Sequence, residues 1–302
     1  NMNNLKKIGL TALAGSLVAT SVAYAGALEA TGTAQMKVEN NSASSAGKTF
    51  GMANNIYFKG SGETDGGLNV ALSFELDQAN AAGTAGVYDN HFVSVGNDTL
   101  GTLTVHGHGG SNSAAALDTT AAGDLWDNTL MNTDAALATR AAPFASTSGN
   151  NLMVYSLPTM IDGLAIAGSY QAANSTGSGS SAYGLTYTGV DGLTAKYGVG
   201  DSGAPGSETE STTMMDSYAM GAITLSASNT EADNTGAANR EVDSYQLAYT
   251  VSDDISVTYG SETFDLAGNA TDEEVEAFGV SYTSGGMTIS ANSYEAKGAA
   301  NT

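Results

Sequence analysis

Residues Tyr245-Gln246-Leu247-Ala248-Tyr249-Thr250-Val251 alternate large apolar side chains with small or polar ones. A period of two is typical of a β-strand with one apolar face. The alternation recurs in the stretches 68–76, 183–188, 193–199, 255–260 and 278–282. The opposite face of these stretches carries Gly, Ser, Thr, Asn and Gln far more often than Lys and Glu. The sequence therefore predicts an all-β chain whose strands have one apolar face and one small, polar face.

Two kinds of β fold share this pattern. A soluble sandwich buries the apolar face in a core, whereas a transmembrane barrel turns it to lipid and lines a wet lumen with the polar face. The connections distinguish the two folds, because short, turn-rich connections alternate strictly with longer ones. The short ones are 60–67, 96–101, 158–163, 189–192, 220–222, 251–254 and 284–286, and the long ones are 40–48, 79–88, 107–149, 172–181, 200–213, 230–241 and 265–273. Such alternation predicts consecutive hairpins with periplasmic turns and outer loops, as in an up-and-down antiparallel transmembrane β-barrel.

Fifteen strands are predicted. They are 27–39, 48–59, 67–78, 89–96, 101–107, 149–157, 163–172, 181–189, 192–199, 213–220, 222–230, 241–251, 254–264, 273–283 and 286–295. Bacterial barrels have an even number of strands. We therefore expect 15 strands of a 16-stranded barrel, with two unpaired edges and one further strand encoded after Thr302.

The N-terminus has the pattern of an export signal. Lys6 and Lys7 precede an apolar stretch over 8–22, which ends in the small-x-small site Ala23-Tyr24-Ala25. This pattern predicts a signal peptide over 1–25, which leaves 26–302 as the barrel domain. Residues 1–25 hold two Lys and no acid, so the remaining chain has seven basic and 31 acidic residues, a net charge of −24.

Composition excludes several classes of protein. The chain has no Cys, which rules out a disulfide scaffold, a thiolate metal site and a Cys nucleophile. The strong negative charge rules out a nucleic-acid binder.

Aromatic side chains on the predicted outward face suit the lipid–water boundary. They are Tyr183, Tyr187, Tyr197, Tyr245, Tyr249, Tyr259, Phe278 and Tyr282.

Several short motifs along the chain resemble those of the trimeric, 16-stranded general porins of Gram-negative outer membranes, in particular the alphaproteobacterial type. They are 61–68 (SGETDGGL), 100–107 (LGTLTVHG), 154–158 (VYSLP) and 161–164 (IDGL). The resemblance implies an outer-membrane homotrimer in contact with lipid and lipopolysaccharide. It also implies a water-filled channel for passive diffusion of ions and small hydrophilic solutes, narrowed by a third long loop folded into the barrel.

The connection 107–149 is unusual without reference to any family. It is far longer than most loops and holds the only Trp of the chain, Trp126. Its leucines are Leu117, Leu125, Leu130 and Leu137. A loop suspended in water has no need of these apolar anchors, so the sequence predicts a loop packed against the barrel wall. Its acids are then expected at the constriction: Asp118, Asp124, Asp127 and Asp134.

Few basic side chains are available to face the lumen. The candidates are Lys37, Lys59, Lys196 and Arg140, of which the three lysines fall on the inward phase. Related porins often carry pore-facing arginines where this chain has Gln35, Ala53 and Asn55. The acids on the inward phase are Glu29, Glu39, Glu75, Asp77 and Glu262. A cation-preferring pore is therefore expected.

No enzymatic or metal site is predicted. Gly200-Asp201-Ser202-Gly203 matches a serine-protease motif but lies in a predicted loop without a histidine base. His106 and His108 are interpreted as lumen-lining residues. The acidic loop 265–274 is interpreted as solvated, with loosely held Ca²⁺ as the alternative. The alternative to a porin is a soluble exported β-rich surface protein or adhesin, but no fixed internal repeat supports it.

Overall fold

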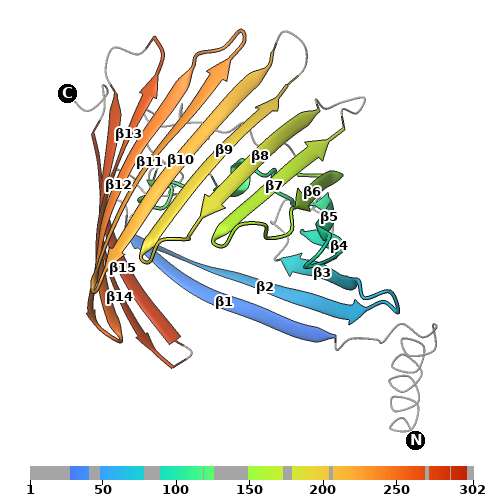
Figure 1. Cartoon of the computed structure of the whole chain (residues 1–302). Coiled ribbons are helices and arrows are strands. Elements are labelled where there is room, and N and C mark those ends of the chain that lie inside the picture. Colours follow the sequence, from blue (N-terminus) through green and yellow to red (C-terminus); the bar gives the residue numbers. More distant parts are fainter. Residues whose placement is uncertain are drawn as a thin grey trace, which may run out of the picture.

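The computed structural model describes residues 28–40, 48–77, 89–117, 119–125, 149–172, 179–203, 207–268, 272–285 and 287–297. These residues form one 15-stranded antiparallel sheet in which every strand pairs with its neighbours in the sequence (Figure 1). The all-β, up-and-down prediction is confirmed. The expected signal peptide over 1–25 lies outside the described residues. Within the described part of the chain, no helix is long and apolar enough to cross a membrane.

The fifteen strands correspond one to one with the predicted segments. They are β1 (Glu29–Asn40), β2 (Lys48–Glu63), β3 (Asn69–Asp77), β4 (His91–Asn97), β5 (Gly101–His108), β6 (Leu152–Ser156), β7 (Leu164–Gln171), β8 (Ser180–Tyr187), β9 (Leu193–Ser202), β10 (Thr209–Met220), β11 (Ile223–Asn234), β12 (Arg240–Ser252), β13 (Ile255–Leu266), β14 (Glu273–Ser284) and β15 (Met287–Lys297).

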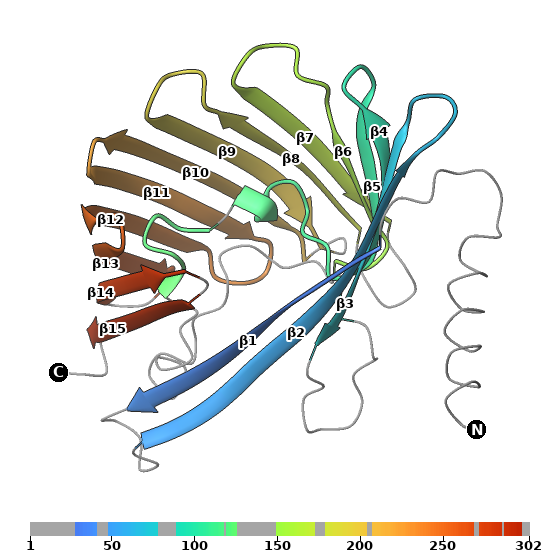
Figure 2. The same cartoon turned by 90° about the horizontal axis from the view of Figure 1, so that it is seen from below.

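Strands β1 and β15 are the two ends of the sheet. They are not paired with each other in the described residues. Every strand is antiparallel to the next, so β1 and β15 run in the same direction. Viewed from below, β3–β15 curve around the chain segment that follows β5, while the long β1–β2 hairpin extends across the open side (Figure 2). The sheet therefore has two unpaired edges, as expected from fifteen strands.

Alternation along each strand separates the two faces of the sheet. On β12, Val242 and Ser244 are fully buried, whereas Tyr245, Leu247 and Tyr249 are exposed. The predicted outward aromatic residues follow the same rule: seven of the eight are exposed and Tyr187 is half-buried. Large apolar side chains therefore cover the outer face, as lipid contact requires.

Small and hydroxyl side chains cover the inner face. Hydroxyl groups pair across neighbouring strands, as in Thr213–Thr230 at 2.9 Å, Ser217–Ser226 at 3.0 Å and Ser281–Ser290 at 3.1 Å. These groups are neutral, and those that are not buried can exchange their hydrogen bonds with water. The inner wall is thus suited to a wet lumen.

Candidate pore constriction

The segment that follows β5 lies against the inner face of the sheet, as predicted for the loop 107–149. Its first contact is with strands β7–β9. The Ser113 N–H donates to Ser169 Oγ at 2.8 Å, and Ala114 is fully buried. The side chain of Asn112 accepts the N–H groups of Ala114 and Ala115 and so begins the short 3₁₀ helix Ala115–Leu117.

Glycines make the wall flat beneath this first contact. A Cβ on Gly184 would lie 2.2 Å from the Ser113 carbonyl oxygen, and a Cβ on Gly198 would lie 3.0 Å from Ala114 Cα. Any larger residue would push the loop backbone off the wall. The close approach explains why glycine occupies these two inward positions.

The second contact of the loop is with strands β11–β13. The N–H groups of Ala121 and Ala122 donate to Ser228 Oγ and Ser244 Oγ, both at 2.8 Å. Thr120 Oγ1 donates to Glu262, a carboxylate that is only 2% exposed and also accepts a hydrogen bond from Ser244 at 3.2 Å. Three hydrogen bonds therefore fasten three consecutive loop residues to three neighbouring strands.

A tight turn follows these three hydrogen bonds. Asp124 Oδ1 accepts the Thr120 N–H at 2.9 Å, and the Asp124 N–H donates to Thr120 Oγ1 at 2.7 Å. Gly123 and Asp124 both have positive φ, at 87° and 55°. Leu125 then packs on Val275 of β14. Of the predicted constriction acids, Asp124 is thus on the loop inside the barrel, and its carboxylate stabilises the turn.

The other predicted constriction residues divide into two groups. Lys59 and Lys196 lie on the inner face: Lys196 has the phase of Gly198, and Lys59 pairs with Ser73 of β3. The Lys59 ammonium lies 5.4 Å from the centre of the Tyr57 ring. The other predicted residues lie outside the described part of the chain, except Lys37, whose backbone is described but whose side chain is not. They are Asp118, Trp126, Asp127, Asp134, Arg140 and Lys37.

Glu75 lies on the same inner face, on β3, and is 5% exposed. Its carboxylate accepts hydrogen bonds from the side-chain amides of Asn55, at 2.9 Å, and Asn90. Asn55 is one of the positions where an arginine was expected from the resemblance. Amides stabilise the carboxylate without neutralising it, and no ion pair of Glu75 occurs among the described residues. The inner wall therefore carries a negative charge here.

The histidines show no shared ligand site. The His106 ring lies 5.6 Å from the ring of Phe92, whereas His108 contacts Asp89. In the described part of the chain, no group of three or more His, Asp or Glu side chains could hold a metal ion.

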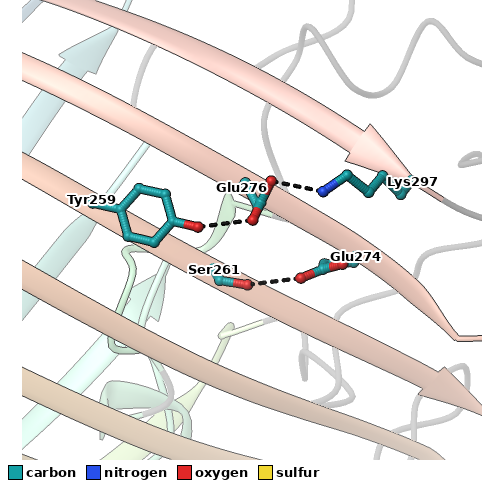
Figure 3. A network of polar contacts seen from close by, with 5 residues as sticks. All are labelled: Tyr259, Ser261, Glu274, Glu276 and Lys297. Atoms are coloured by element: carbon teal, nitrogen blue, oxygen red, sulfur yellow. Dashed lines mark hydrogen bonds and ion pairs between the residues drawn. The ribbon is translucent and has the colours of Figure 1, made fainter.

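The outer face becomes polar toward the loop ends of the strands. Figure 3 shows the Tyr259 hydroxyl and the Lys297 ammonium donating to the two oxygens of Glu276, each at 2.8 Å. Ser261 and Glu274 form a longer contact beside them, at 3.4 Å. These residues have the outward phase of Tyr245 and Phe278. The network therefore marks the upper limit of the apolar band.

Comparison with known proteins agrees with this geometry. A family model described as Gram-negative porin matches residues 9–301. A search of curated proteins finds no match.

Three solved porins are similar in fold. An anion-selective porin from Comamonas acidovorans has a TM-score of 0.63 and 17% identity, over 88% of each chain. OmpF of Salmonella typhi, in a complex with daunomycin, has a TM-score of 0.68 and 15% identity, over 89% of this chain and 90% of that one. A mutant of Rh. blastica porin has a TM-score of 0.65 and 14% identity, over 89% and 94%. The fold, the inward loop and the family model agree: the chain belongs to the Gram-negative porin family.

Proposed function

We propose that this chain forms a water-filled channel for passive diffusion of ions and small hydrophilic solutes across the outer membrane, with a preference for cations. Membership of the Gram-negative porin family supports the outer-membrane location and the channel. The observation that carries the proposal is the loop fastened to the inner wall at Ser169, Ser228 and Ser244. A loop held against the inner wall of a barrel narrows the passage without closing it.

Cation preference rests on the charges of the inner wall. Glu75 is held by neutral amides that leave its charge in place, so it adds a negative potential to the inner wall. The similar porin from Comamonas acidovorans is anion-selective, so the fold itself does not set the sign of the preference. The side chains that line the lumen must set it.

A salt gradient across a planar bilayer tests both parts of the proposal. We expect the refolded protein to conduct, with a reversal potential of the sign for cation preference. Glu75→Gln should move that potential toward zero. Glu210→Gln, which removes an exposed carboxylate from the outward face of β10, is the matched control and should leave it unchanged. The absence of conductance would contradict the channel, whereas an anion-preferring potential would contradict only the selectivity.

We further propose that the channel is a homotrimer embedded in outer-membrane lipid and lipopolysaccharide. Small side chains on the outward face of β1, at Ala30, Gly32 and Ala34, support close approach of a second backbone. No cofactor or catalytic role is proposed. A monomeric mass for the complete protein in mild detergent would contradict the trimer.

A further inference from the structure

Asp216 is an exposed carboxylate on the outer face of β10. The register places it directly opposite Ala195 of β9 and Ala227 of β11. Its neighbours on the same strand face are Met214 and Tyr218, which are 50% and 44% exposed. A single acid thus interrupts an otherwise apolar part of the wall.

Neighbouring strands show how unusual this position is. Tyr218, Tyr249 and Tyr282 each lie three or four residues before a short turn, on β10, β12 and β14. Two residues farther from the turn, β12 has Leu247 and β14 has Val280, both exposed to the outside. The corresponding residue of β10 is Asp216.

The depth of Asp216 follows from strand geometry. Short turns of outer-membrane barrels face the periplasm, and strands tilt by roughly 35–45°. Tyrosines near the turns mark the lipid–water boundary. With a rise of about 3.4 Å per residue, Asp216 lies about 5 Å deeper than Tyr218 along the membrane normal. This depth is within reach of lipid headgroups of the periplasmic leaflet.

A hollow of about 460 Å³ opens beside the carboxylate. The alanine at 227 leaves space between larger neighbours on both sides. The hollow is lined by Asp216 together with Tyr218, Leu225, Ala227, Tyr245, Leu247 and Tyr259. Its outward walls are otherwise apolar and aromatic, as an acyl chain requires. One charged group and one apolar hollow are therefore adjacent.

Asp216 has no hydrogen bond or ion pair with any residue that the structure describes. Lys196 of the adjacent strand has the inward phase of Gly198 and points away from it. An ionised carboxylate at the edge of hydrocarbon is costly unless a cation or a donor meets it. A cation or donor from outside the described chain would remove this cost.

We propose that Asp216 and this hollow form a binding site for an amine-bearing phospholipid of the periplasmic leaflet, such as phosphatidylethanolamine. The primary ammonium donates hydrogen bonds to the carboxylate, and one acyl chain occupies the hollow. A quaternary ammonium has no N–H to donate, and an anionic headgroup is repelled by the carboxylate. The site therefore selects the primary amine by charge and by hydrogen bonding.

Native mass spectrometry of the refolded full-length chain in mild detergent tests the site. The protein is mixed with phosphatidylethanolamine, phosphatidylcholine and phosphatidylglycerol of the same acyl chains. We expect wild type to retain phosphatidylethanolamine most strongly. Asp216→Asn should lower that retention about tenfold, to the level of phosphatidylcholine. Glu210→Gln, an equal charge change on the same face near the loop end, should leave it unchanged.

A second variant keeps the test valid if Asp216→Asn does not fold. Ala227→Leu fills the hollow, keeps the carboxylate and should also reduce retention. Equal retention of phosphatidylethanolamine and phosphatidylcholine by wild type would overturn the proposal. So would carbodiimide cross-linking of Asp216 to a lysine of another protein, which would show a protein occupant. Conductance of Asp216→Asn should equal that of wild type, so the lipid site and the channel are tested separately.

Discussion

Replacing Ser228 and Ser244 together by alanine is expected to loosen the constriction loop from the wall. The two hydroxyls accept the N–H groups of Ala121 and Ala122, both at 2.8 Å. Removal of an acceptor leaves a buried donor unsatisfied, at a cost of about 1–3 kcal/mol for each donor. The double variant should therefore lose about 2–6 kcal/mol of docking free energy.

This loss is comparable with the whole free energy of docking at that contact. Three hydrogen bonds between loop and wall contribute about 1 kcal/mol each. Burial of Leu125 adds about 1.5–3 kcal/mol. Even the smaller loss, about 2 kcal/mol, raises the ratio of undocked to docked loop about 30-fold. The segment should then leave the wall often enough to be seen in the current.

Single-channel recording in a planar bilayer measures this directly. The double variant should show added current noise and brief excursions in conductance. Ser281→Ala is the matched control, because its hydroxyl bonds Ser290 on the inner wall and no loop residue. Traces of the double variant that match both wild type and Ser281→Ala would refute the idea that these hydroxyls hold the loop.

Three further substitutions probe the loop, the lipid face and the lumen charge. Gly260→Val should displace the loop and change the conductance, because a Cβ at Gly260 would already lie 2.7 Å from Ala122 Cβ of the loop. An unchanged conductance would show that the wall moves and the loop does not. Leu247→Asp places a charge toward lipid and should lower the free energy of unfolding in lipid vesicles by about 1 kcal/mol. Gln246→Glu, on the lumen side, should not lower it. Equal losses for the two variants in urea titrations would contradict the assignment of faces. Asn55→Arg should neutralise the charge of Glu75 and shift the reversal potential in the direction of anion preference. An unchanged potential would show that residues other than Glu75 set the selectivity.

The sequence predicted the strands well because one face of each carries a strict apolar alternation. The prediction was wrong at the loop ends of β9, β10 and β11. The sheet there extends over 200–202, Thr209–Thr212 and Glu231–Asn234, so the motif at 200–203, which was predicted to lie in a loop, lies mostly on β9. Residues there are mostly polar on both faces, so no period of two marks them. These extensions lie toward the loops, above the lipid, where the pairing of backbone groups does not require an apolar face.

The candidate site was predicted in outline only. The loop 107–149 was expected inside the barrel from its length and apolar residues, and Leu125 does pack on the wall. The wall partners Ser169, Ser228 and Ser244 could not be singled out, because they resemble every other small polar residue of the lumen face. Outward acids such as Glu276 were also missed, although they share the phase of Phe278 and could have been found from it.

The second contact of the loop with the wall has a consequence for how such a channel diversifies. The wall hydroxyls of Ser228 and Ser244 hold peptide N–H groups, which every residue except proline possesses. The side chains at those loop positions are limited by packing instead: Ala121 and Ala122 are 5% and 9% exposed, and the Ala122 methyl group lies over Gly260. A larger residue at either position would press the loop away from the wall. Sequence variation that alters permeation is therefore expected at loop positions outside this contact, while 121 and 122 keep small residues.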